Sequence, residues 1–261
     1  MNIFQKLFNK IMSWLDEYYS RDDREEIKKL NEEISIKTTL LDNSILTFKE
    51  NQLIIHNLNQ TIKSINQKKI VEEELETYWN NKRPKSTIKY PGRPIRNSFT
   101  RILINPRVFF TNDNSIPSIS GKTNDEKARN SLLWVINNVR YTSDSSQFKV
   151  PEVWLFPFET LKLKKGDCED GAILMANLMV KAGIPYWRIR LNAGDVKDFG
   201  HVWVTYLRET DNKWVILDWC YYPTAKVRSL NKLYSNAEDY FKIWFSWNSK
   251  FIFRGDKLDR K

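Results

Sequence analysis

The first part of the chain contains no residue that would break a helix. The first proline is Pro84 and the first glycine is Gly92. Proline removes a helical hydrogen bond and glycine loses more backbone freedom on folding, so their absence favours a long continuous helix. We therefore predict a helical region over residues 1–80. Apolar residues recur within it at strict seven-residue spacing; they are Ile27, Ile34, Leu41, Phe48, Ile55 and Ile62.

This seven-residue repeat favours a coiled coil, and with it a homo-oligomer joined through residues 27–65. The alternative is a helical hairpin that folds against the chain's own domain. A second row of positions, three residues further along, is apolar at its ends and polar in its middle. Its members are Leu30, Lys37, Ser44, Asn51, Leu58 and Ile65.

Residues 1–20 are apolar at helical spacing, but charged residues interrupt them and no small-residue cleavage site follows. This pattern is not that of a signal peptide, and no apolar run of the sequence is long enough to cross a bilayer. The segment could lie on a membrane surface. Because Lys6 and Lys10 are the only basic residues before Asp16, packing against a partner helix is the favoured interpretation.

The net charge of +10 is unevenly distributed. Residues 1–83 carry 13 basic and 14 acidic side chains, whereas residues 84–261 carry 29 and 18. A linker or arm is predicted over residues 81–122, because its first part is rich in proline. The basic 82–107 segment could meet nucleic acid or an acidic partner. A solvated tether is the favoured alternative, since aromatic residues for stacking on bases are sparse.

The third region, residues 123–261, is predicted to be an α+β domain. Thr123 and Glu126 have the spacing of a capping box and open a helix. A second helix is expected over residues 168–182, where the sequence is apolar nearly all round, and this helix should therefore be central. Strand-like runs follow at 186–191, 201–207 and 213–219, and short connections between them favour an antiparallel sheet.

Cys168 is predicted to be the first residue of the central helix. The sequence has only one other cysteine, Cys220, so no disulfide framework is expected, and two histidines are too few for a usual zinc site. Unpaired N–H groups and the helix dipole favour a thiolate at Cys168. Carboxylates at 167, 169 and 170 oppose it. On this stretch alone, a structural cysteine is as good an interpretation as a reactive one.

His201 and Asp218 favour the reactive interpretation. A nucleophilic cysteine needs a base, and His201 is the only histidine of the predicted domain. Asp218 lies inside an apolar strand, where a hydrogen bond from His201 would satisfy it and orient the imidazole. A tight turn at residues 211–212 would pair His201 with Tyr222 instead. We therefore expect an asymmetric connection between the two strands.

Three segments in the correct order resemble the transglutaminase-like superfamily, a papain-related group. They are GDCEDGAILMANLMVKAGIP, GHVWVTY and WVILDW, and the resemblance extends over about residues 128–223. The segment VWLFPFETLKLKKGDCED is similar to the bacterial cysteine-peptidase branch. The resemblance implies a papain-like core with a triad of Cys168, His201 and Asp218, and acyl transfer through a thioester. The family often has proline after the aspartate, where this chain has Trp219.

The same resemblance suggests how an oxyanion would be held. The donors would be the Cys168 backbone N–H and, by analogy with an upstream tryptophan of transglutaminases, the Trp154 indole. The alternative is that Trp154 is only a core aromatic residue. Cys220 is interpreted as a packing residue. No cofactor or metal is expected, because the sequence contains no EF-hand-like loop or comparable acidic ligand cluster.

The expected function is therefore a cysteine-dependent enzyme acting on amide bonds of a protein or peptide, with hydrolysis favoured over cross-linking. The alternative is a structural or interaction protein that uses the fold as a docking module in a larger assembly. WVILDWCYYP and YFKIWFSWN also look like versions carried by tailed bacteriophages. That likeness implies either the cytoplasm of a bacterial host or a virion as the location.

Overall fold

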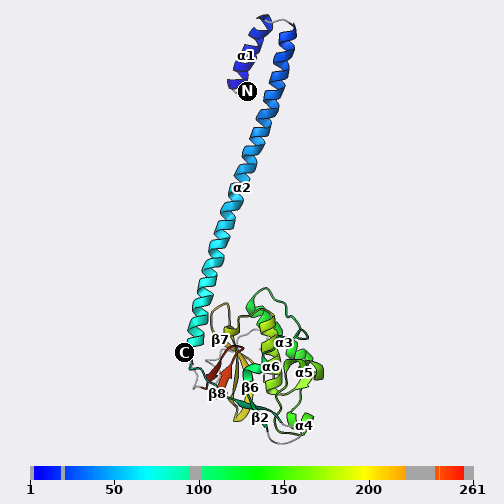
Figure 1. Ribbon diagram of the computed structural model, residues 1–261, viewed down its shortest axis with the longest axis vertical. Helices are drawn as coiled ribbons and strands as arrows, with labels where there is room; N and C mark the ends of the chain where they lie inside the picture. The colour runs from blue at the N-terminus through cyan, green and yellow to red at the C-terminus, as the bar shows by residue number, and fades with distance from the viewer. Residues whose placement is uncertain (1–2, 19–20, 95–100, 222–238, 241, 256–261) are drawn as a thin grey trace. The chain divides into compact units, whose positions relative to one another are not determined.

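The computed structural model describes the chain in five stretches, residues 3–18, 21–94, 101–221, 239–240 and 242–255. The chain divides into two compact units, residues 1–72 and 73–261. Each is described separately below, and their elements can be followed in Figure 1.

The first unit consists of helix α1 (Ile3–Tyr18) and most of helix α2 (Arg21–Asn81). The two helices touch where the Asn31 side-chain amide approaches the Met12 sulfur at 3.5 Å. Apolar side chains of α2 at the seven-residue positions stay exposed, by 50% for Ile55 and 63% for Phe48. Among the described helices, none combines the length and hydropathy needed to cross a membrane.

The second unit contains a five-stranded antiparallel sheet of order β7-β6-β5-β8-β9. Strand β6 carries His201 and lies between β5 and β7. The β5–β6 hairpin turns at Lys197 and Asp198, whose φ values of 50° and 69° suit a two-residue turn of the primed type. The strands are β5 (Ile189–Val196), β6 (Phe199–Leu207), β7 (Trp214–Leu217), β8 (Lys242–Trp247) and β9 (Ile252–Arg254).

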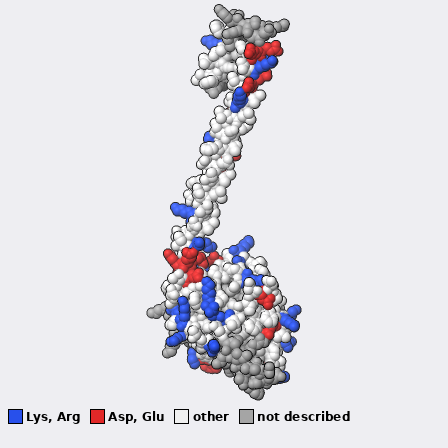
Figure 2. Space-filling model, viewed as in Figure 1, with Lys and Arg blue, Asp and Glu red and all other residues white. Residues whose placement is uncertain are grey.

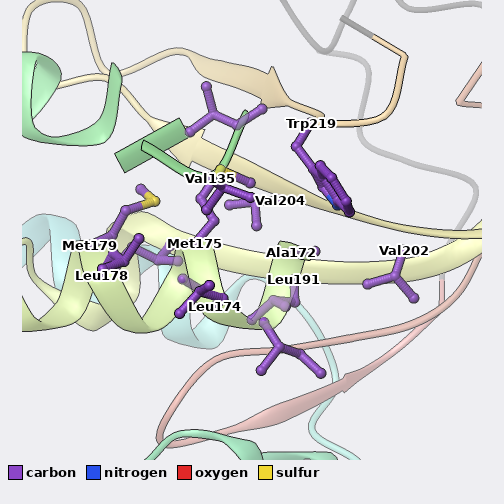
Figure 3. Packing of buried hydrophobic residues seen from close by; sticks show 14 of the residues in the cluster. Val135, Ala172, Leu174, Met175, Leu178, Met179, Leu191, Val202, Val204 and Trp219 are labelled. Carbon is purple, nitrogen blue, oxygen red and sulfur yellow. The ribbon is translucent and has the colours of Figure 1, made fainter. Parts of the chain in front are cut away.

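Helix α6 (Cys168–Lys181) packs on this sheet and is buried along most of its length. Figure 3 shows Ala172 and Met175 of α6 gathered with Leu191 and Val204 of the sheet. The helix ends where Gly183 has a φ of 84°, a left-handed conformation that glycine adopts without strain. The other helices are α3 (Asn124–Asn138), α4 (Asp144–Phe148), α5 (Pro157–Leu163), and the 3₁₀ turns η1 (Pro106–Phe109) and η2 (Tyr186–Arg188).

Two further strand pairs lie outside the main sheet. Strands β1 (Tyr90–Pro94) and β2 (Arg101–Ile104) pair antiparallel, and β3 (Arg140–Tyr141) pairs parallel with β4 (Lys165–Gly166). Residues 84–86 bond to β9, with Ser86 N–H donating to the Ile252 carbonyl at 2.8 Å. The start of the basic segment is thus part of the second unit.

The predicted α+β class, with an antiparallel sheet and a long N-terminal helix, is confirmed. The expected helix at 168–182 corresponds to α6. The segment 186–191 begins as the turn η2 and becomes a strand only at Ile189. Strands β8 and β9 were not foreseen. The proposed boundaries at 80 and 122 stay predictions.

Candidate active site

Helix α6 begins at Cys168, and an acidic capping pair shapes this start. Asp167 is the N-cap residue, and its backbone N–H donates to Asp170 Oδ2 at 3.2 Å. The other Asp170 oxygen accepts from the Leu155 N–H at 2.8 Å. A Cβ on Gly166 would lie 2.5 Å from Asp170 Oδ2, so a glycine is needed there. The motif thereby places Cys168 in the first turn of the helix, where the backbone N–H groups have no partner within the helix.

The Cys168 thiol donates to Glu169 Oε2 at 3.2 Å. Burial raises the pKa of this thiol well above its usual value, and the nearby Asp167 carboxylate raises it further. A hydrogen bond from the Val202 backbone N–H works in the opposite direction. Burial and the acidic flank thus oppose the thiolate that the helix terminus favours.

His201 and Asp218 are in direct contact. His201 Nε2 lies 2.8 Å from Asp218 Oδ2, and both side chains are buried. This contact leaves Nδ1 of the imidazole as the nitrogen available to a second partner. The Val202 backbone N–H, which donates a hydrogen bond to the Cys168 sulfur, belongs to the residue after His201 in β6. The three predicted residues thus come from α6, β6 and the end of β7 into one region of the fold.

Trp154 lies in the core rather than at an open surface. Its side chain is 1% exposed and stacks on Trp247 with ring centroids 5.6 Å apart. Its indole N–H donates to Glu152 Oε1 at 2.7 Å. For Trp154 to hold an oxyanion, this hydrogen bond would have to open or be shared. The assigned role stays a prediction.

Trp219, which replaces the proline common in the resembling family, packs across the first turns of α6. Its indole N–H donates to the Cys168 carbonyl at 3.1 Å. A Cβ on Gly171 would lie 2.2 Å from Trp219 Cε2. The second glycine of the GDCEDG motif therefore makes room for this ring. The neighbouring Cys220 is partly buried against the same core and its thiol pKa is raised, chiefly by burial.

A group of four carboxylates lies close to Cys168. Ligand oxygens of Asp144, Asp167, Glu169 and Asp170 lie within 4.8 Å of one another, a spacing at which they could hold a divalent cation. Burial is the largest cause that raises the pKa of Asp167, Glu169 and Asp170, and the neighbouring negative charges add to it for Glu169 and Asp170. The repulsion between these carboxylates can be relieved by a bound cation or by protonation of one or more of them.

This cluster was not expected from the sequence, and the absence of a metal requirement stays a prediction. Three of its members were visible around Cys168 and were interpreted as helix-terminal charges. The fourth, Asp144, comes from α4, and its carboxylate accepts the Val153 N–H. No sequence spacing connects Asp144 to the motif. The sequence reasoning also assigned no role to Tyr240, whose hydroxyl donates to Asp218 Oδ2 at 2.6 Å.

The central helix, the antiparallel sheet and a cysteine at the helix start are consistent with a transglutaminase-like core. In agreement, residues 116–219 match the family model of the transglutaminase-like superfamily. This match contains Cys168, His201 and Asp218. None of the curated proteins matches the chain.

Solved structures similar to this chain include those of LapG from Legionella pneumophila. The EGTA-treated form has a TM-score of 0.43 and 19% sequence identity, with 52% of this chain and 69% of that chain covered. The calcium-bound form has a TM-score of 0.38 and 22% identity, with 50% of this chain and 74% of that chain covered. These comparisons give no support to the proposed bacteriophage likeness.

Proposed function

We propose that this protein is a cysteine-dependent acyl-transfer enzyme that hydrolyses amide bonds, as a peptidase or amidase. The buried contact of 2.8 Å between His201 Nε2 and Asp218 Oδ2 carries the proposal. A carboxylate that holds one imidazole nitrogen fixes the tautomer and directs the other nitrogen toward a proton donor. Cys168 supplies that donor.

The proposed first step couples proton transfer to attack. The raised thiol pKa means that Cys168 rests as a neutral thiol. His201 accepts the thiol proton at Nδ1 while the sulfur forms a bond to the amide carbonyl carbon. Negative charge moves to the carbonyl oxygen, where the Cys168 backbone N–H and the Trp154 indole are the proposed donors. Asp218 stabilises the imidazolium but keeps its own charge.

Collapse of this intermediate breaks the C–N bond, and His201 returns the proton to the leaving amine. The acyl group is then held as a thioester on Cys168. A water molecule attacks the thioester with His201 as base, which releases the carboxylic acid and restores the thiol. The sum of the steps consumes one water and one amide bond and yields an acid and an amine.

The reactivity of the two cysteines tests this proposal. Full-length protein is treated with iodoacetamide at neutral pH, and labelled residues are located by peptide mass spectrometry. Cys168 should be labelled, and labelling should persist in Cys220→Ala but disappear in Cys168→Ala. His201→Asn should slow it, because the base is lost. Acylation by p-nitrophenyl acetate should follow the same pattern.

Labelling that is lost only in Cys220→Ala, or that does not depend on His201, would contradict the enzyme proposal. The remaining candidate would then be a docking module of a larger assembly, which uses the fold without its chemistry.

A further inference from the structure

We infer that Tyr240 is a positioning residue for His201 and acts through Asp218. This inference rests on the proposed function, because it concerns the same base. Tyr240 precedes β8 and is 1% exposed. Its hydroxyl donates to Asp218 Oδ2 at 2.6 Å, the same oxygen that lies 2.8 Å from His201 Nε2.

Asp218 is held by donors on both carboxylate oxygens. Oδ1 accepts the backbone N–H groups of Cys220 at 2.8 Å and Tyr221 at 3.2 Å. The backbone donors fix the turn in which Asp218 lies. Among the described residues, the phenol of Tyr240 is the only donor that competes with His201 for Oδ2. It therefore controls how much negative charge that oxygen presents to the imidazole.

The ring of Tyr240 packs against Trp203, which also packs against the His201 imidazole. It packs edge-on against Trp203 with centroids 5.1 Å apart, and Trp203 stacks on His201 at 6.2 Å with an interplanar angle of 11°. Trp203 and Tyr240 belong to a small buried cluster separate from the main core. A Tyr240→Phe variant would keep this packing and remove only the hydroxyl.

Loss of that hydroxyl changes the balance between Asp218 and His201. A carboxylate with one donor fewer is more basic and attracts the imidazolium more strongly. His201 should then hold its proton to higher pH and be a poorer base at neutral pH. Among the described residues, the other ionisable groups around it are Cys168, Asp167, Cys220 and Tyr221, with Lys197 over the Tyr221 ring. None of these is altered by the substitution.

The test compares Tyr240→Phe with Tyr206→Phe. Tyr206 is also buried and also donates to a carboxylate, Asp125 Oδ1, at 2.7 Å, but in another part of the domain. Iodoacetamide labelling of Cys168 is measured against pH. In Tyr240→Phe the acid limb should move up by about half a pH unit, with about threefold slower labelling below it. In Tyr206→Phe the limb should stay in place.

An independent readout separates this inference from the enzyme proposal. The chain has two histidines, and His56 on the exposed part of α2 is an internal reference. NMR titration of both rings should show only the His201 curve displaced to higher pH in Tyr240→Phe. An unchanged His201 curve in a folded variant would refute the role of Tyr240. A displaced His201 curve, together with Cys168 labelling that is as fast in His201→Asn as in the wild type, would refute the enzyme proposal instead.

A separate observation on α2 supports a second inference: we propose that residues 27–65 pair with a second copy of this chain as a parallel two-stranded coiled coil. Ile34, Leu41, Phe48, Ile55 and Ile62 are 50–63% exposed. Helix α1 has 16 residues and α2 has 61, so α1 spans less than half of the apolar row at ~1.5 Å per residue.

The pattern itself indicates the partner. Isoleucine dominates the first row of the repeat, and the second row has leucine at Leu30 and Leu58. Isoleucine in the first row with leucine in the second favours two parallel strands. Few charges interrupt the middle of α2 on the face seen in Figure 2. A second copy matches the row in length and spacing.

Light scattering after size exclusion tests the pairing on the full chain. The expected mass is twice the 31.1 kDa of one chain. Leu41→Lys with Ile55→Lys should halve it. The matched control is Leu46→Lys with Leu53→Lys, which changes equally exposed residues off the repeat and should leave the dimer intact. A wild-type chain that runs as monomer or trimer, or a control pair that dissociates equally, would refute the proposal.

Discussion

The substitution Gly171→Ala has opposite expected effects on stability through helix propensity and through packing against Trp219. In an exposed helix interior, this change would add about 1 kcal/mol of stability, because alanine loses less backbone entropy than glycine. In this fold the new Cβ would lie 2.2 Å from Trp219 Cε2 and 2.3 Å from Nε1. Those atoms belong to a rigid ring that is 5% exposed, so the ring has to move.

The cost of that movement can be bounded. Overpacking of a core costs about 1–3 kcal/mol. The displaced ring also loses its bond to the Cys168 carbonyl, which is worth about 0.5–1.5 kcal/mol. After the gain in helix propensity, a net loss of about 0.5–3.5 kcal/mol is expected. The sign is thus opposite to that expected from helix propensity.

Urea unfolding of Gly171→Ala, Trp219→Leu and the double variant measures this coupling as a double-mutant cycle. In the Trp219→Leu background the clash is absent, so Gly171→Ala should become neutral or stabilising. A Gly171→Ala variant that is more stable than wild type, or a coupling energy near zero, would show that Trp219 does not occupy the space over Gly171.

Three further variants address the chemistry around Cys168. Burial is the main cause that raises the pKa of Glu169 in the folded protein. The free energy of unfolding of the wild type should therefore fall as the pH rises from about 4.3, the usual value for a glutamate, through the raised pKa. The slope due to this one group is at most about 1.4 kcal/mol per pH unit. In Glu169→Gln, the free energy of urea unfolding should depend less on pH between about pH 5 and 8. The control Glu50→Gln, at an exposed position, should keep the wild-type dependence. The same slope of unfolding free energy against pH in both variants would contradict the argument. Asp167→Asn removes a charge that raises the Cys168 pKa, so iodoacetamide labelling at fixed pH should become faster, and a slower rate would be the opposite of that expectation. Trp154→Phe should slow acylation by p-nitrophenyl acetate by roughly tenfold or more but leave alkylation by iodoacetamide unchanged, because only acylation forms an oxyanion; equal effects on both reactions would assign Trp154 to packing.

The features that the sequence predicted well are those with local causes. Helix α6 starts at a capping aspartate and ends at Gly183 and Pro185, so both ends can be read within a few residues. The seven-residue repeat likewise places α2. The features that were missed depend on distant segments. Asp144 reaches the carboxylate group from α4, and Tyr240 reaches Asp218 from beyond the hairpin.

The contact between His201 and Asp218 shows how a register argument can mislead. Val204 pairs with Leu217 and Leu207 with Trp214, so a ladder extended in the same register would place His201 opposite Cys220. The tight turn that would have paired His201 with Tyr222 does not form, and the pairs contain no bulge.

The ladder ends instead at Leu217, one residue before the aspartate. Asp218 Oδ1 then accepts the N–H groups of Cys220 and Tyr221, which turns the chain out of the strand and directs Oδ2 toward His201. The two oxygens of one carboxylate thus have separate tasks, since one fixes the turn and the other binds the imidazole. An aspartate placed directly after a buried strand is therefore a better sequence signal for this contact than any count of residues across the hairpin.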